Sequence, residues 1–88
     1  MSWEKREIRV SDELRNLLTE RAVSDDYIKQ VIHHAETTGD KLYQPESNRY
    51  LARYRLGKVT VYVEYSESEN GDYVIQTAYW HRSTVGKV

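Results

Sequence analysis

One stretch decides the fold class of this chain: Val59-Thr60-Val61-Tyr62-Val63-Glu64-Tyr65. Valine alternates there with polar or amphipathic side chains, and a period of two residues is that of a strand with one buried face. Gly57-Lys58 before it is a tight turn, which makes residues 50–56 a second strand. Asn70-Gly71 is a hairpin signal, and residues 73–82 after it form the last long strand. The second half of the chain therefore predicts an antiparallel meander.

The first half of the chain has a helical period of about 3.6 residues instead. Ser11 and Ser24 are each followed by two acidic residues, which is typical of a capped helix start. Gly39 is a natural end for the second helix. Residues 5–10 alternate loosely as a short first strand, and residues 41–43 are a short extended piece. The expected apolar faces of the two helices are Leu14, Leu17, Leu18 and Ala22, and then Tyr27, Ile28, Val31, Ile32 and Ala35.

This order of elements, β-α-α-β-β-β, predicts an α+β fold in two layers. Two helices should pack on one face of an antiparallel sheet of about four strands. With 88 residues the chain has material for a single domain, which we expect to span residues 1–88. We expect its ordered core over residues 5–82 and a tail over residues 83–88.

The two turns assign side chains to the two faces of the sheet. Pairing across them gives a core face that consists of Tyr54, Val59, Val61, Val63, Ala78 and Trp80. It gives an opposite face that consists of Arg53, Arg55, Tyr62, Glu64, Tyr79 and His81. An alternative stays open, because a bulge in the acidic segment 66–69 would slip the second hairpin by one residue. That slip would exchange Trp80 and Tyr79 between the faces.

The composition limits what the chain can do. It contains no cysteine, which excludes disulfides, iron–sulfur clusters, thiolate zinc sites and cysteine nucleophiles. Because it has no run of about 18 apolar residues and begins with charged residues, we expect neither a membrane-spanning helix nor a secretory leader. We therefore expect a cytoplasmic protein. The net charge is −1, with four cations over residues 49–63 and four acids over residues 64–72.

We expect neither a metal nor a nucleotide cofactor. His33 and His34 are adjacent on a helix, so they point about 100° apart and cannot chelate one ion together. The four glycines are isolated along the chain and form no phosphate-binding loop.

The opposite face supplies a candidate interaction face that consists of Arg53, Arg55, Tyr62, Tyr79 and His81. Guanidinium groups grip phosphate, tyrosine stacks on bases, and histidine transfers protons near neutral pH. This chemistry suits metal-free RNA cleavage, and the order of elements resembles the ribosome-dependent mRNA interferase toxins of the RelE-like superfamily. That resemblance implies an RNA-binding or RNA-cleaving domain, although such toxins are strongly basic. The residues alone are also compatible with an exposed face of ordinary cross-strand pairs.

A closer resemblance lies in three stretches, which are His34-Ala35-Glu36-Thr37-Thr38-Gly39-Asp40-Lys41-Leu42-Tyr43, the stretch 59–65 quoted above, and Ala78-Tyr79-Trp80-His81-Arg82. Together they resemble a small bacterial domain found with flavin-dependent pyridine-nucleotide oxidoreductases of the glutamate synthase small-subunit type. The chain lacks the glycine fingerprint and the cysteines of those enzymes. The resemblance therefore implies a non-catalytic accessory or fused domain that docks an oxidoreductase subunit or domain, without catalytic residues or a cofactor of its own.

A third hypothesis is a homodimer. The chain has eight tyrosines and no phenylalanine, so a tyrosine-rich sheet face or an edge strand could join two copies. A protein is thus the expected partner, nucleic acid is the alternative, and no membrane partner is expected.

Overall fold

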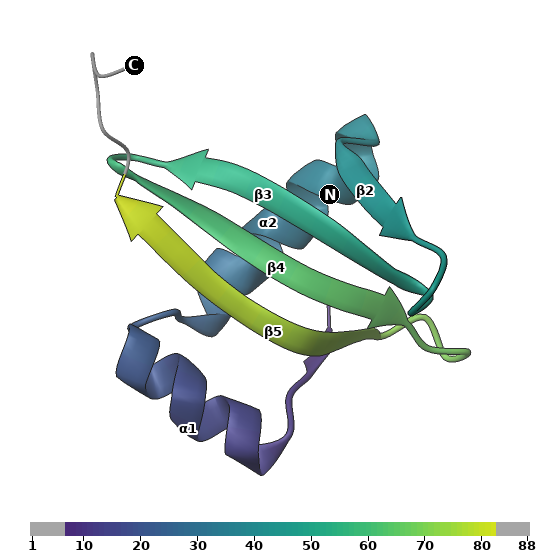
Figure 1. Cartoon of the computed structure of the whole chain (residues 1–88), viewed down its shortest axis with the longest axis horizontal. Helices are drawn as coiled ribbons and strands as arrows, with labels where there is room; N and C mark the ends of the chain where they lie inside the picture. The colour runs from purple at the N-terminus through teal and green to yellow at the C-terminus, as the bar shows by residue number, and fades with distance from the viewer. Residues whose placement is uncertain (1–6, 83–88) are drawn as a thin grey trace.

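The computed structural model describes residues 7–82, which form two helices and one five-stranded sheet (Figure 1). The elements are β1 (Ile8–Arg9), α1 (Asp12–Arg21), α2 (Asp25–Thr38), β2 (Lys41–Gln44), β3 (Arg49–Leu56), β4 (Val59–Glu67) and β5 (Tyr73–Arg82). The strand order is β1-β5-β4-β3-β2, with α1 against β5 and α2 against β3 and β4. The predicted two-layer α+β fold is confirmed.

The helix boundaries follow from capping, as predicted. Ser11 accepts a hydrogen bond from the backbone N–H of Leu14, and Ser24 accepts one from that of Tyr27. Gly39 ends α2 with φ of 79°, a left-handed conformation that costs glycine little. The prediction for Ala22 was wrong, because this residue ends α1 with φ of 60° instead of lying on its apolar face. The turn that it makes brings Val23 into the core.

The first two strands differ from the prediction. Among the described residues of the first strand, Ile8 and Arg9 pair with the sheet, and they run parallel to β5, so the sheet is mostly rather than wholly antiparallel. Residues 5 and 6 of the predicted first strand and the predicted tail lie outside the described residues. The short extended piece is a true strand, because the chain turns at residues 45–48 and returns β3 alongside it. The sheet therefore has five strands instead of about four.

The second hairpin reaches the predicted register by a different route. Glu67 pairs with Tyr73, so the loop runs over residues 68–72 rather than over two residues. Farther along, Glu64 pairs with Thr77 while Tyr65 pairs with Ile75, which leaves Gln76 as an extra residue in a bulge. The loop shifts the register by one residue and the bulge shifts it back. The predicted cross-strand partners are therefore confirmed, namely Thr60 with His81, Val61 with Trp80, Tyr62 with Tyr79 and Val63 with Ala78.

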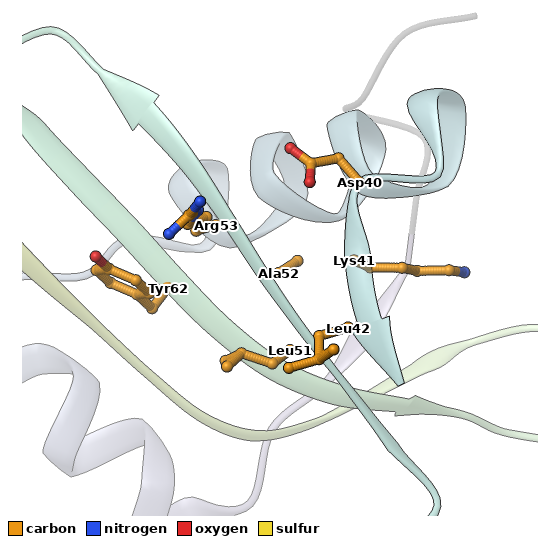
Figure 2. Close-up of a pocket in the computed structure, with 7 residues that line it drawn as sticks. All are labelled: Asp40, Lys41, Leu42, Leu51, Ala52, Arg53 and Tyr62. Atoms are coloured by element: carbon orange, nitrogen blue, oxygen red, sulfur yellow. The ribbon is translucent and has the colours of Figure 1, made fainter. Parts of the chain in front are cut away.

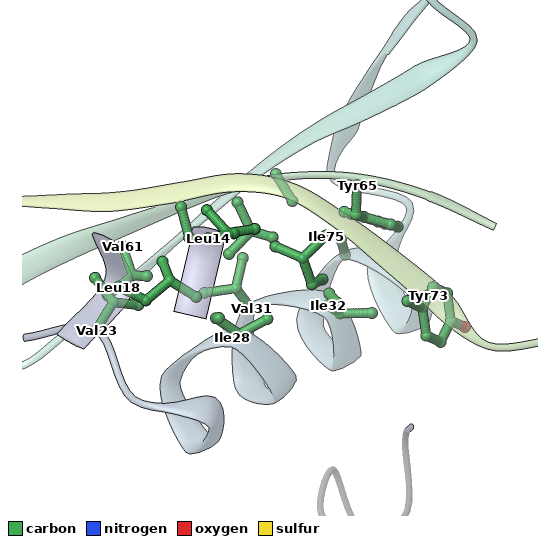
Figure 3. Packing of buried hydrophobic residues seen from close by; sticks show 14 residues of the cluster. Leu14, Leu18, Val23, Ile28, Val31, Ile32, Val61, Tyr65, Tyr73 and Ile75 are labelled. Carbon is green, nitrogen blue, oxygen red and sulfur yellow. The ribbon is translucent and has the colours of Figure 1, made fainter. Parts of the chain in front are cut away.

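The core lies between the helices and one face of the sheet, as Figure 3 shows. From α2 it receives four completely buried side chains, Ile28, Val31, Ile32 and Ala35. From the sheet it receives Ala52, Val61, Val63, Tyr65, Tyr73, Ile75 and Ala78. Three expected core residues, Tyr54, Val59 and Trp80, are partly buried and pack around its border. Tyr54 and Trp80 flank the completely buried Val61 on either side, and Val59 is the first residue of β4.

A buried hydroxyl joins α2 to the sheet. Tyr65 is completely buried, and its hydroxyl donates a hydrogen bond to Oε2 of Glu36 over 2.7 Å. The Nζ of Lys41 lies 2.6 Å from the same oxygen and 4.3 Å from the centre of the Tyr50 ring. One carboxylate thus ties α2 to both β4 and β2.

This network shifts two pKa values upward. Burial raises the pKa of Tyr65, and the hydrogen bond to the Glu36 carboxylate raises it further. Burial lowers the pKa of Lys41, but the hydrogen bond and the negative charge of Glu36 outweigh that effect, so its pKa lies above its ordinary value.

Truncation of Trp80 should cost more stability than truncation of its neighbour Tyr79, because the two side chains lie on opposite faces of the sheet. Trp80 lies on the core face and its indole N–H donates to the carbonyl of Arg21, whereas Tyr79 stacks on the other face. We expect Trp80→Ala to lower the free energy of unfolding by about 3 kcal/mol, near the lower limit for large aromatic truncations because the ring is only partly buried. Tyr79→Ala should cost less than about 1.5 kcal/mol. Urea unfolding measures both, and equal or reversed costs would contradict the register.

The buried hydroxyl predicts a loss of stability in alkali. Above pH about 10 the unfolded chain ionises this tyrosine while the folded chain keeps it protonated, so stability falls as the pH rises. The raised pKa of Lys41 acts in the same direction above about pH 10.5. Tyr65→Phe should lower the free energy of unfolding by about 2 kcal/mol at pH 7. Above pH about 10 the free energy of unfolding of this variant should fall less steeply with pH than that of the unmutated chain, by up to about 1.4 kcal/mol per pH unit.

Urea unfolding between pH 7 and about pH 11 tests this linkage. The control is Tyr43→Phe, since the Tyr43 hydroxyl is exposed and donates to Oδ1 of Asn48. This control should cost less than about 1 kcal/mol and leave the alkaline decline unchanged. An unchanged decline in Tyr65→Phe would refute the linkage.

Candidate functional site

All five predicted interaction residues lie on the sheet face opposite the helices, which we call the open face. Arg53 pairs with Tyr62 and Tyr62 with Tyr79, while Arg55 pairs with Thr60 and Thr60 with His81. Directly opposed residues of antiparallel strands point to the same side of a sheet. The alternating burial along β4 sets that side, because Val61 and Val63 are buried and Tyr62 between them is not.

Three rings of this face touch one another, and we call them the ring cluster. Tyr62 and Tyr79 are stacked, with centroids 5.0 Å apart and planes 13° from parallel. His81 meets both edge-on at 77°, with its centroid 5.6 Å from Tyr62 and 5.5 Å from Tyr79. Such contacts hold each ring in place before any partner arrives.

The two arginines of the open face differ in their contacts. Nε of Arg55 donates to the carbonyl of Gly57 over 3.0 Å, which fixes it near the β3–β4 turn. The side chain of Arg53 is exposed and makes no ion pair or hydrogen bond with the other side chains of residues 7–82. Its guanidinium group is thus available to an outside anion.

Two adjoining hollows flank Arg53 and share Asp40, Arg53 and Tyr62 in their walls. The larger, of about 370 Å³, lies between β2 and β3 and is drawn in Figure 2. Leu42 and Leu51 also line it, and they are cross-strand partners. Leu42 is 62% exposed, so an apolar patch borders the arginine.

Sequence reasoning missed Asp40, Leu42 and Leu51 as parts of this region. The period of two residues along β3 could have found Leu51, because residues 51, 53 and 55 share a face. Leu42 and Asp40 had no such signal, because their positions depend on how β2 pairs with β3.

Charges are separated along the sheet. The β3–β4 turn end carries Arg55, Lys58 and Arg82, whereas the β4–β5 loop end carries Glu67, Glu69 and Asp72. The one acid on β4 that faces the open side, Glu64, pairs with Arg49 at 2.9 Å. Asp72 pairs with Arg9 at the same distance. The cationic half of the open face therefore has few acids beside it.

His34 of α2 contacts residues near the start of β2 and on β3. His34 stacks on Tyr54 with centroids 4.4 Å apart, and its Nε2 lies 3.4 Å from Oδ2 of Asp40. Over residues 7–82, no three side chains of the metal-binding kind come together. None of the helices described is long and apolar enough to cross a membrane.

Comparison with known proteins adds no family, since no protein-family model, curated protein or solved structure matches the chain. The fold and the open face therefore define residues 7–82 as an α+β domain whose sheet has a partly cationic, aromatic face opposite the helices. Both resemblances seen in the sequence remain predictions.

Proposed function

We propose that this domain is a non-catalytic protein-interaction module that docks its partner on the open face. One observation carries the proposal. The ring cluster lies on the open face with Tyr62 and Tyr79 half-buried and His81 exposed, and Tyr62 shares a hollow with the apolar side chain of Leu42 and with Arg53, whose side chain has no ion pair within residues 7–82.

The residue types on this face are those that contribute most to protein–protein binding. Tyrosine and arginine are enriched among the residues whose truncation costs most affinity. Stacking between Tyr62 and Tyr79 fixes both rings in the unbound domain, so less conformational entropy is lost on docking. Arg53 can then pair with a partner carboxylate that binding removes from water.

The sequence resemblance supplies the partner in this proposal. An oxidoreductase of the glutamate synthase small-subunit type would carry the flavin and the nucleotide, and this domain would contribute contacts only. Such a partner needs acidic and apolar groups where it meets Arg53 and Leu42.

RNA binding is the second candidate function, and the same face favours it. Bases can stack on exposed aromatic rings, and the two arginines can contact phosphates. Against it stands the net charge of −1, since a polyanion is not attracted at long range by a chain of this charge.

Docking on the open face predicts that truncation of Tyr79 weakens partner binding and that truncation of Tyr43 does not. Tyr79→Ala should weaken binding to a purified bacterial oxidoreductase of the glutamate synthase small-subunit type by about 30-fold, the loss typical of a central anchor residue. Tyr43→Ala, an equal truncation of a 46% exposed tyrosine on the other side of the sheet, should change affinity less than about threefold. Isothermal titration calorimetry measures both. Equal losses would reject the open face, and no binding by the unmutated domain would reject this partner.

If RNA were the ligand, its affinity for the domain would fall steeply with salt, whereas docking of a protein predicts weak RNA binding throughout. A single-stranded RNA titrated at about 50 and about 200 mM salt should bind weakly to the domain at both concentrations. Arg53→Ala/Arg55→Ala should change this little, as should the control Arg9→Ala/Arg15→Ala, which removes two arginines whose ion pairs lie elsewhere. Tight binding whose salt slope falls by about two in the first variant alone would favour RNA instead. RNA cleavage that is lost in His81→Ala would do the same.

A further inference from the structure

Strand β3 is covered along only half of its outer edge. β2 pairs with residues 49–52 of β3, and no strand within residues 7–82 lies beyond β2. Residues 53–56 continue past the start of β2, as Figure 1 shows, with β4 on one side and no strand of the described chain on the other.

The turn geometry shows which backbone groups this edge offers. Leu56 and Val59 close a two-residue loop in which Gly57 has φ of 67°, and such a closing pair is hydrogen-bonded. Hydrogen-bonded and non-hydrogen-bonded pairs alternate along an antiparallel ladder, so Leu56 and Tyr54 bond to β4. The N–H and C=O groups of Arg55 therefore point outward with no described strand beside them, whereas those of Arg53 face Asp40, because Asp40 precedes Lys41, the partner of Ala52. Neither residue takes part in a loop or turn backbone hydrogen bond within the described chain.

The space beside this edge is open. A hollow of about 280 Å³ wraps around it, with Arg53 and Arg55 on the open face and Tyr54 and His34 on the helix side. A second hollow, of about 180 Å³, lies behind Tyr54 against α2 and is lined by Gln30 and Thr38 among others. An extended segment laid along β3 would have room for its side chains on both faces.

The charge of the edge selects the kind of segment. Arg53 and Arg55 project from it on the open face two residues apart, with Lys58 in the adjoining turn. Asp40 is the only acid in the walls of the 280 Å³ hollow, and its carboxylate lies beside His34. In an added strand, a residue directly opposite Arg55 would share its face.

We propose that the outer edge of β3 accepts an extended acidic segment of a partner protein as a sixth strand. One carboxylate would lie opposite Arg55, a second at the end of the segment next to Asp40 would pair with the guanidinium group of Arg53, and the side chain between them would face Tyr54 and the hollow against α2. The segment would donate to and accept from the outward backbone groups of Arg55. This inference rests on the proposed docking function and names the part of the partner that the edge binds.

A peptide of alternating glutamate and valine, about ten residues long, tests the proposal. In an NMR titration of the whole chain, the amide signals of Arg53 and Arg55 should shift, and the Arg55 amide should exchange with solvent at least about tenfold more slowly in the complex. A peptide of alternating lysine and valine should bind at least about tenfold more weakly. Equal binding of both peptides, or unchanged exchange at the Arg55 amide, would overturn the proposal.

Two variants at one position separate edge pairing from docking on the open face. Arg55→Ala removes the charge but keeps the outward N–H, whereas Arg55→Pro removes both, and proline is tolerated at strand edges. Edge pairing predicts that the proline variant binds the acidic peptide at least about fivefold more weakly than the alanine variant. Equal losses would overturn edge pairing while leaving docking through charge in place. The exchange measurement needs no variant, so it stands if the proline chain fails to fold.

Other occupants give different results. Shifts of the Arg53 and Arg55 amides that grow with protein concentration in the absence of peptide would assign the edge to a second copy of the chain, and shifts of both amides caused only by RNA would assign it to nucleic acid. Either result would overturn the proposal.

Discussion

The rest of the structure depends on the two-residue period of β4, the central strand of the sheet. Val61, Val63 and Tyr65 point into the core and are completely buried, while Tyr62 and Glu64 between them point away. Because both neighbouring strands pair with β4 residue by residue, its alternation decides which face of β3 and β5 meets the helices. A slip of one residue would place the ring cluster in the core and valines in water.

Stability and the candidate function lie on opposite sides of this one strand. The core side combines α2 with the inner valines and ends in the hydrogen bond from Tyr65 to Glu36. The open side carries Tyr62, Tyr79 and His81, whose contacts are mainly with one another. Substitutions on the open face can therefore alter binding with little cost to folding, which makes the docking proposal open to mutational tests.

The edges of the sheet differ in a way that bears on function. The short β1 covers part of β5 with two residues, and β2 covers the first half of β3. The uncovered half of β3 has cationic side chains and adjoining hollows, and it runs into the open face through Arg53 and Tyr62. A partner segment on this edge would therefore lie next to the ring cluster, and both surfaces could contact one protein.

The sequence by itself determined the helices, their serine caps, the β3–β4 hairpin and the assignment of Arg53, Arg55, Tyr62, Tyr79 and His81 to one face. These features rest on local periods and on a tight turn, so neighbouring residues are enough to specify them. Only the tertiary structure decided the pairing of β2 with β3, the parallel β1, and the hollows around Asp40 and Leu42, because each depends on residues distant in the chain. The register of β5 depends on both the local sequence and the tertiary structure. Its predicted partners are right, but a longer loop and a bulge at Gln76 produce them, and two offsets that cancel leave no trace in the residue pattern.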